Sequence, residues 1–462
     1  MRDKHDVLIL GGGLAGLTLA LQLKGRRPEL DVAVVERLRY PVPVAAHKVG
    51  ESTVEIGAHY FSHVLGLREH LRNDQLLKFG LRFFFGGPRP GPDLAAYDEV
   101  GPSDLLPPVN SYQLDRGIFE NHLAGRAAAL GVAIVDGASV QKVELSGNGR
   151  NHRAVIRADS GQQTMGARWM VDASGRRGLI RRQLGLHKPT AHQNCAIWLR
   201  TSEALDIDEW SDAPAWRSRC ALSRRLSTNH FMGPGYWVWL IPLSSGTTSV
   251  GFVFDPRFHA LEDVTTFEGF LRWLDIHQPL IGRVLREKSD TLMDFRFLRG
   301  YPHSCREVFS SDRWALSGEA GVFSDPFYSP GSDFIAIGNT LITDLIVSES
   351  AGYSTPQRAR YYQQLYFSFF SSTLSLFTNQ YAGFGDRDLM FVKTIWDYAY
   401  YWSVLAKLFF AGKLTDIAFL ESVEPDLLRA LRLNREVQRS FETVGARARF
   451  PAPEGRFLDH CS

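Results

Sequence analysis

The sequence predicts an α/β protein in which a sheet-and-helix core carries an inserted β-sheet domain and ends in a helical region. Near the N-terminus, a short apolar strand over 6–10 runs into the glycine-rich turn 11–16 and then into a helical pattern from Leu17. In the middle of the chain, residues 237–242 alternate their large apolar side chains as a buried strand does. Toward the C-terminus, residues 361–414 repeat aromatic and apolar side chains at spacings of three and four, which indicates amphipathic helices.

The composition is that of a soluble globular protein. The chain has 462 residues, of which 44% are hydrophobic and 22% charged, so it is long enough for two or three structural units. A net charge of +2 predicts no general attraction to nucleic acids or anionic membranes. No apolar leader follows Met1 and no uncharged apolar run is long enough to cross a bilayer. We therefore expect neither export nor a transmembrane segment.

The cysteines are scattered along the chain, with no C-x-x-C pair and no histidine cluster at metal-binding spacing. They are Cys195, Cys220, Cys305 and Cys461. We therefore expect no disulfide framework and no metal site. A cytoplasmic location is expected, because free thiols suit a reducing compartment.

The glycine-rich turn has the G-x-G-x-x-G spacing in the strand–turn–helix context of a dinucleotide site. Gly11 permits the tight turn, Gly13 lets a pyrophosphate approach the backbone, and Gly16 lets helix and strand pack closely. The start of the helix, where Ala15 lies, presents free N–H groups to the phosphates. Glu36 ends the next predicted strand, where an acid binds a ribose hydroxyl. The alternative is a glycine turn followed by a surface acid.

Three further segments resemble the glutathione-reductase-type, Rossmann-like FAD-binding domain of flavin monooxygenases and halogenases. Residues 112–120 resemble its R-x-x-F helix entry, 171–175 its D-A-x-G turn, and 314–326 its G-D-A-x-x-x-x-D-P segment. The resemblance implies that these segments bind FAD through Arg116, Asp172, Gly318, Glu319, Asp325 and Pro326. Glu319 stands where the family usually has aspartate, and its carboxylate can still accept a hydrogen bond from a hydroxyl. No second dinucleotide fingerprint is present, so we expect a separate flavin reductase to supply FADH2.

Two more segments resemble flavin-dependent halogenases in particular among the proteins with this FAD-binding domain. The segment 48–52 resembles the V/I-G-E-S/A loop that lies against the flavin, which adds five residues to the expected FAD site: Lys48, Val49, Gly50, Glu51 and Ser52. Residues 237–242 spell W-x-W-x-I-P, which resembles the signature of flavin-dependent halogenases. Trp237 and Trp239 are expected on one face of a strand that ends at Pro242. The alternative for this strand is ordinary core.

Lys78 lies among apolar residues at the start of a predicted strand. Burial would lower the pKa of its amine and make the amine available for chemistry. The position matches the reactive lysine of the halogenases, which holds hypohalous acid or a haloamine and delivers the halogen to an electron-rich aromatic ring. The resemblance implies that Trp237, Trp239 and Pro242 shape the tunnel that leads to this lysine. The alternative is a surface lysine whose ammonium reaches water.

The expected halide site follows the D-P pair at 325–326. Tryptophan halogenases read D-P-x-E-S-T-G there, whereas this chain has Tyr328 in place of the glutamate and Pro330 in place of the threonine. Since proline has no N–H to donate, Gly331 and Ser332 are expected to hold a chloride or bromide ion. Tyr328 argues against free tryptophan as the substrate. A phenolic or pyrrolic substrate of natural product biosynthesis is expected instead, either free or tethered to a carrier protein.

The motifs divide the chain into four stretches. Residues 1–185 are expected to form the first part of the FAD-binding domain, with a sheet excursion around 76–115. The β-sheet substrate domain is expected over 186–305, the second part of the FAD-binding domain over 306–345, and a helical region that caps the substrate pocket over 346–462.

The sequence alone leaves open the role of one arginine-rich stretch and two alternative functions. The arginine-rich stretch 429–449 is either a solvated helix face or a dock for an acidic carrier protein. A flavin monooxygenase that hydroxylates an aromatic ring would share the fold, and Pro330 favours it. A lipid-chain saturase would use the aromatic C-terminal helices as an acyl groove.

Overall fold

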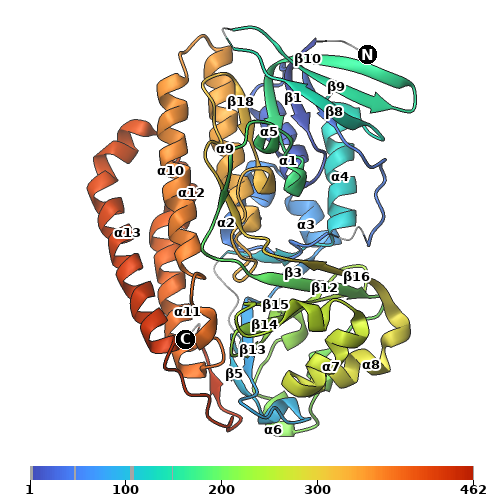
Figure 1. Cartoon of the computed structure of the whole chain (residues 1–462), viewed down its shortest axis with the longest axis vertical. Coiled ribbons are helices and arrows are strands. Elements are labelled where there is room, and N and C mark those ends of the chain that lie inside the picture. The colour runs from blue at the N-terminus through green and yellow to red at the C-terminus, as the bar shows by residue number, and fades with distance from the viewer. Residues whose placement is uncertain (1–3, 46–47, 105–108, 148, 461–462) are drawn as a thin grey trace.

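The computed structural model describes residues 4–45, 48–104, 109–147 and 149–460. It has a sheet-and-helix part that carries the N-terminus, a second sheet below it, and a column of long helices along one side (Figure 1). The fold is α/β, as the sequence predicts.

The first sheet has seven strands, with the spatial order β7-β2-β1-β10-β9-β8 and β18 paired to β10. Five of the strands are parallel, and β8 and β9 add an antiparallel edge. The strands span β1 Lys4–Leu10, β2 Val32–Val35, β7 Ala133–Val135, β8 Ser139–Glu144, β9 His152–Ala158, β10 Gly161–Asp172 and β18 Trp314–Leu316. The expected stretches 1–185 and 306–345 thus both contribute strands to this sheet.

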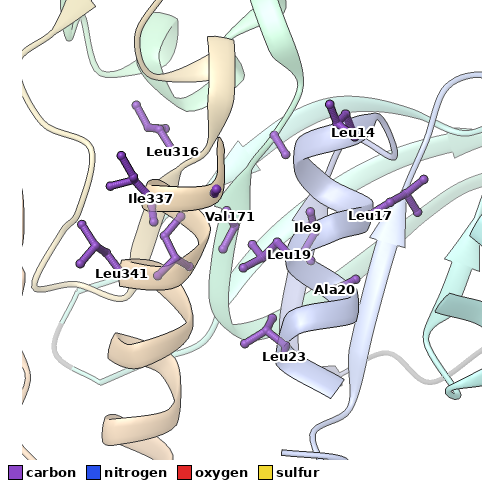
Figure 2. Packing of buried hydrophobic residues seen from close by; sticks show 14 of the residues in the cluster. Ile9, Leu14, Leu17, Leu19, Ala20, Leu23, Val171, Leu316, Ile337 and Leu341 are labelled. Atoms are coloured by element: carbon purple, nitrogen blue, oxygen red, sulfur yellow. The ribbon is translucent and has the colours of Figure 1, made fainter. Parts of the chain in front are cut away.

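The core of this part lies between the parallel strands and two helices, α1 (Leu14–Arg26) and α9 (Gly331–Ser350). Figure 2 shows Leu19 and Leu23 on the side of α1 that faces α9, with Val171 of β10 between the two helices. The central strands are apolar on both faces because helices cover both faces of a parallel sheet. A third helix, α4 (Arg116–Ala129), packs against α1.

The second sheet has eight strands in the order β16-β12-β15-β14-β13-β4-β5-β19. They span β4 Leu81–Phe85, β5 Asp98–Val100, β12 Cys195–Thr201, β13 Thr228–Gly233, β14 Tyr236–Pro242, β15 Thr248–Phe254, β16 Leu292–Leu298 and β19 Phe457–Leu458. Most come from 186–305, while β4 and β5 come from the excursion around 76–115. The strand β19, from the end of the chain, pairs with β5, a position that the sequence did not predict.

The predicted alternation of the tryptophan strand is confirmed. Trp237 and Trp239 face one side of β14, where they pack with Phe327, while Val238 and Leu240 face the other side. The strand ends at Pro242, as expected.

The remaining elements are short strands and helices. Two small sheets pair β3 Leu76–Lys78 with β6 Ser111–Gln113 and β11 His187–Pro189 with β17 His303–Cys305. The other α-helices before the C-terminal region are α2 Glu55–His59, which continues into a π-helical turn over Tyr60–Val64, α3 Arg68–Asp74, α5 Leu179–Gln183, α6 Pro214–Arg217, α7 Phe267–His277 and α8 Pro279–Glu287.

The C-terminal region is helical, as predicted. It contains α10 Pro356–Ser375, α11 Arg387–Tyr401, a π-helical turn over Trp402–Ala406, α12 Lys407–Phe410 and α13 Ile417–Gly445. The helix α9 crosses the expected boundary at 345/346, because its buried apolar stripe continues through Leu345 and Ile346. Among the described residues, each helix is either too short or too polar to span a bilayer.

Three of the four cysteines lie within the described residues. Cys195, Cys220 and Cys305 are buried free thiols, and Cys461 lies outside the described residues. Within the described ranges, no group of three histidine, cysteine or acidic side chains is placed to hold a metal ion.

Candidate active site

The glycine turn between β1 and α1 is closed on its protein side and open on the other. Gly11 has a φ of +118°, and a side chain there would clash with the carbonyl of Ala173. A side chain on Gly16 would clash with the carbonyl of Gly11. At Gly13, by contrast, the nearest atom to an added Cβ would lie 4.0 Å away. A phosphate can therefore approach the backbone at Gly13.

Glu36 follows β2 and lies beside this turn. Its Oε2 accepts a hydrogen bond from Gly12 N at 2.7 Å, and its Oε1 accepts one from Leu38 N at 2.9 Å. Ala15 is half-buried in the first turn of α1. Both residues therefore lie at the turn where the sequence predicts a dinucleotide.

A buried carboxylate that sequence reasoning missed joins the loop 48–52 to α4. Glu120 accepts a hydrogen bond from Arg116 Nη2 at 2.5 Å and forms an ion pair with Lys48. Arg116 Nη1 donates to the carbonyl of Val49 at 2.7 Å. Burial acts to raise the pKa of Glu120, but the two cations more than offset it and lower the pKa. The sequence could have indicated this ion pair, because Arg116 and Glu120 lie four residues apart in a predicted helix and therefore on the same helix face.

The expected FAD segments meet the tryptophan strand around one cavity, the first cavity, of about 120 Å³. Its lining includes Val49, Gly50, Glu51, Ser52, Arg116, Gly318, Glu319, Pro326, Trp237, Trp239, Gly331 and Ser332. Arg116 Nε is buried without a hydrogen-bond partner among the described residues, and it is free for a ligand atom. Arg116 Nε, which has no partner, and the open backbone at Gly13 both fit a dinucleotide cofactor that enters this cavity.

Two of the predicted cofactor-binding acids use their carboxylates within the protein. Asp172 accepts hydrogen bonds from Ser174 N at 3.0 Å and from Ile180 N at 2.8 Å, and so fixes the turn after β10. Asp325 accepts hydrogen bonds from Tyr381 Oη at 2.8 Å and Tyr301 Oη at 3.2 Å, and it also contacts His192. Neither side chain lines the first cavity, so contact of these residues with the cofactor stays a prediction.

Glu51 is held by a protein partner too. It lines the first cavity and forms a buried ion pair with Arg200 of β12. Arg200 Nη1 also donates to the carbonyl of Val44 at 3.0 Å. The loop 48–52 is therefore anchored to the second sheet through Arg200 and to α4 through Arg116.

The tryptophans are held rigidly. Trp237 Nε1 donates to Tyr381 Oη at 2.8 Å, and Tyr381 donates in turn to Asp325. Trp239 Nε1 donates to Ser249 Oγ at 3.2 Å, and its ring fills the space that a side chain on Gly251 would occupy. Tyr381 was missed by sequence reasoning, since it lies far along the chain. The two indoles form a fixed wall of the first cavity, and Pro242 lies outside that wall.

The helix α9 begins at this wall with a strained turn. Tyr328 and Ser329 have φ values of 66° and 58°, in the left-handed region that side chains rarely adopt. Gly331 and Ser332 then line the first cavity, and Ser332 Oγ is buried with no partner among the described residues. Since the first N–H groups of a helix have no intrahelical acceptor, this end of α9 can hold an anion.

Lys78 is buried, with 1% of its surface exposed. The surface alternative is therefore wrong. Its Nζ donates to Ser52 Oγ at 2.9 Å and to the carbonyl of Thr53 at 2.7 Å. Burial lowers the pKa of Lys78 to about 8, while the carboxyls of Glu55 and Asp333 act against the shift.

A second cavity, of about 50 Å³, lies on the other side of α9. Its lining includes six aromatic side chains and three acids: Tyr328, Phe334, Phe377, Tyr398, Tyr400, Tyr401, Glu55, Asp333 and Asp397. Several of the aromatic side chains come from the C-terminal helices, which the sequence predicts to cover a pocket. The cavity thus offers flat apolar surfaces with a few polar groups, as sites for small aromatic molecules do.

The first turn of α9 separates the two cavities. Gly331 and Ser332 face the first cavity, Pro330 and Asp333 face the second, and Phe334 lines both. Lys78 itself lines neither cavity, but its partner Ser52 lines the first and its neighbour Glu55 lines the second, so it lies at the same partition. An amine with a lowered pKa therefore lies between the residues that line the first cavity and those that line the aromatic second cavity.

Comparison with known proteins agrees with this geometry. Residues 4–254, more than half of the chain, match the FAD binding domain family. The flavin-dependent halogenase chlA of Dictyostelium discoideum is 27% identical over 384 residues, which cover 74% of this chain and 60% of that protein. The 1H-pyrrole-2-carbonyl-[peptidyl-carrier protein] chlorinase of Pseudomonas fluorescens is 26% identical over 352 residues, which cover 71% of this chain and 72% of that protein.

Solved structures show the same fold. The halogenase PltM superimposes with a TM-score of 0.69 at 19% identity, over 98% of this chain and 88% of that chain. The flavin-dependent brominase Bmp2 superimposes with a TM-score of 0.65 at 18% identity, over 95% and 99% of the two chains. The chain therefore belongs to the FAD binding domain family, its cofactor is FAD, and it resembles flavin-dependent halogenases over most of its length.

Proposed function

We propose that this protein is a flavin-dependent halogenase that uses FADH2, oxygen and chloride or bromide to halogenate an electron-rich aromatic substrate, phenolic or pyrrolic. The position of Lys78 carries the proposal. A buried lysine at the partition between a cofactor cavity and an aromatic cavity is poised to pass a reactive species from one to the other. A hydroxylase on the same fold has no need of such a residue.

FAD is held in this proposal by the glycine turn 11–16, Glu36, the loop 48–52, Arg116 and the segment 318–326. Arg116 Nε, which is buried without a partner among the described residues, is free to donate to the cofactor. Reduced FAD with oxygen supplies the oxidising equivalents that convert the halide to hypohalous acid. The halide is bound at the start of α9 by the N–H groups of Gly331 and Ser332 together with Ser332 Oγ.

Pro330 does not weaken this site, although it lacks an N–H. It lies at the second cavity, one residue before the helix begins, while Gly331 and Ser332 line the first cavity. The two N–H groups expected to hold the halide are therefore separate from the residue that lacks one.

Lys78 receives the hypohalous acid. Its pKa of about 8 leaves both the amine and the ammonium well populated near neutral pH, so it can accept a proton or donate a hydrogen bond. Ser52 and the carbonyl of Thr53 fix its position. The rigid wall of Trp237 and Trp239 keeps the organic substrate away from the cofactor.

Partners follow from this chemistry. A separate flavin reductase supplies FADH2 by diffusion, because only one dinucleotide fingerprint is present. The Pseudomonas relative is named for a carrier-bound pyrrole, and exposed arginines of α13, Arg432, Arg435 and Arg439, would suit an acidic carrier protein. The buried free thiols fit a cytoplasmic location.

The test is turnover with FAD, a purified flavin reductase, NADH, oxygen and either halide, offered with phenols, pyrroles and indoles. Halogenated product that requires both oxygen and halide is the expected result. Oxygen insertion without halide incorporation would establish the hydroxylase instead. Reduction or oxidation of an acyl chain in the absence of oxygen would establish the saturase.

A further inference from the structure

The second cavity contains one acid that its surroundings leave unsatisfied. Glu55 is the first residue of α2, it is 3% exposed, and its Oε2 has no hydrogen-bond partner among the described residues. A buried carboxylate oxygen without a partner costs stability, and native proteins keep few of them. Glu55 therefore fits an acceptor for a ligand that enters the cavity.

The other two acids of the cavity are satisfied by the protein. Asp333 accepts hydrogen bonds from Gly57 N at 2.8 Å and from Tyr401 Oη at 3.0 Å. Asp397 accepts one from Gln438 Nε2 at 2.7 Å and is paired with Lys393 at 2.9 Å. Asp397 Oδ2 has no hydrogen-bond donor either, but it faces the Lys393 ammonium, whereas Glu55 Oε2 has neither a hydrogen bond nor an ion pair among the described residues.

Asp333 and Tyr401 hold Glu55 in place. The same Tyr401 Oη that donates to Asp333 accepts a hydrogen bond from Ile56 N at 2.9 Å, so the two residues that follow Glu55 in α2 are both tied to this pair. Burial raises the pKa of Asp333 to about 8, and the Glu55 carboxyl adds to the shift. Asp333 is therefore mostly neutral at pH 7. Burial raises the pKa of Glu55 as well, while its backbone hydrogen bond and the charge of Lys78 act to lower it.

We propose that Glu55 accepts the hydroxyl hydrogen of a phenol in the second cavity, which makes a neutral phenol the substrate class. This inference rests on the proposed halogenase function. The six aromatic side chains hold the ring, and Glu55 fixes the hydroxyl while Lys78 presents the hypohalous acid. The hydroxyl therefore directs halogenation to a ring carbon ortho or para to it.

The step balances with hypohalous acid as the oxidant. The ring carbon forms a bond to the halogen as the O–X bond breaks, and the departing hydroxide takes a proton from the Lys78 ammonium to become water. The phenol hydroxyl gives its proton to Glu55 at the same time. The ring C–H proton then passes to the Lys78 amine and Glu55 returns its proton to the oxygen, which restores the aromatic ring and both side chains.

Proton transfer to Glu55 favours a phenol over a pyrrole or an aromatic acid as the substrate. A phenol hydroxyl has a pKa of about 10, as in tyrosine, so it can transfer its proton to a buried carboxylate while the ring is attacked. A pyrrole N–H is far less acidic and can only form the hydrogen bond. An aromatic acid would place its own carboxylate against Glu55, and like charges in a buried site repel strongly.

The test compares phenols with their methyl ethers, which lack the hydroxyl hydrogen, in the wild type and in Glu55→Gln. Glu349→Gln, an acid-to-amide change at the far end of α9, is the control for folding and charge. In the wild type the phenol should exceed its ether in kcat/KM, and in Glu55→Gln the phenol rate should fall by about 100-fold or more while the ether rate stays unchanged. Equal wild-type rates for phenol and ether, equal losses for both, or a preference for pyrrole would overturn the inference.

A second readout does not depend on turnover. Calorimetry with the FAD-loaded protein should show binding of the phenol about fivefold weaker in Glu55→Gln, since a hydrogen bond to a charged acceptor is the stronger kind. Equal phenol affinity in the two proteins would contradict the role of Glu55. If a diketone trap detects no hypohalous acid from the wild type, the proposed halogenase function fails. The calorimetric comparison still shows whether Glu55 binds the phenol hydroxyl.

Discussion

Lys78 Nζ donates a hydrogen bond to Ser52 Oγ at 2.9 Å, and this bond ties the amine to the loop that lines the first cavity. Ser52 Oγ is also 2.9 Å from Thr228 Oγ1 of β13, which lies next to the tryptophan strand in the second sheet. The loop, the lysine and the second sheet are therefore joined through one hydroxyl.

Ser52→Ala should release the lysine without unfolding the protein. The variant keeps the hydrogen bond from Nζ to the Thr53 carbonyl but loses the one that fixes the amine from the other side. We expect product formation to fall by about tenfold, while FAD absorbance and the melting temperature remain close to wild type. Ser52→Thr is the control, because it keeps the hydroxyl. A Ser52→Ala variant with wild-type product rates would show that the bond does not position the amine.

Gly331→Ala should weaken halide binding selectively. No protein atom lies within 4 Å of an added Cβ at this position, and alanine is a better helix former than glycine, so stability should hold or rise. The methyl group would instead occupy the cavity at the helix end. The KM for bromide should increase with little change in FAD affinity, as measured by turnover at varied bromide. Ser332→Ala, which removes the unpartnered hydroxyl, should act in the same direction. An unchanged KM in both variants would place the halide elsewhere.

Tyr381→Phe should loosen the tryptophan wall. The phenol of Tyr381 links Trp237 to Asp325, so its removal breaks two buried hydrogen bonds and should cost about 1–3 kcal/mol of stability. With the wall less rigid, more hypohalous acid should escape without reaching substrate. The ratio of trapped oxidant to halogenated product measures that escape, and a ratio equal to that of the wild type would argue against a barrier role for Trp237.

Asp333 predicts a specific pH dependence of stability. Its pKa is raised by burial to about 8, so the folded protein holds a proton on this group that the unfolded chain releases near pH 4. The contribution of this proton to stability is fully present at low pH and is lost as the pH rises toward 8. Asp333→Asn should therefore flatten the fall in melting temperature between about pH 4 and 8. A variant whose melting temperature follows pH as the wild type does would contradict the raised pKa.

Local features of the fold could be predicted from the sequence. Three features could be predicted because each depends on a short run of residues: the glycine turn, the two faces of β14 and the burial of Lys78. In each run, the polarity and spacing of the side chains indicate whether they are buried. The turn at Gly11 needs a positive φ, and alternate residues of a strand face opposite sides whatever the partner strands are. These predictions therefore held without knowledge of the tertiary structure.

Contacts between distant segments could not be predicted in this way. Glu55 and Asp333 lie 278 positions apart in the sequence and meet only because α9 packs on α2. Tyr381 reaches Trp237 from another helical segment, and nothing in its neighbours marks it as a partner for an indole. Asp325 matched a motif for FAD binding, but in the structure its carboxylate is hydrogen-bonded to His192, Tyr301 and Tyr381. The motif does not include these three residues.

The delivery role of Lys78 is tested most directly by the fate of the oxidant in Lys78→Met, a substitution of similar length that fits a buried site. Wild-type and variant proteins would be compared with FAD, a flavin reductase, bromide and a phenol, by measuring brominated phenol and trapped hypobromous acid in the same reaction. If Lys78 delivers the halogen, brominated phenol falls by about 100-fold or more while trapped oxidant persists and FAD binding is retained. A Lys78→Met protein that still brominates the phenol at the wild-type rate would contradict the delivery role.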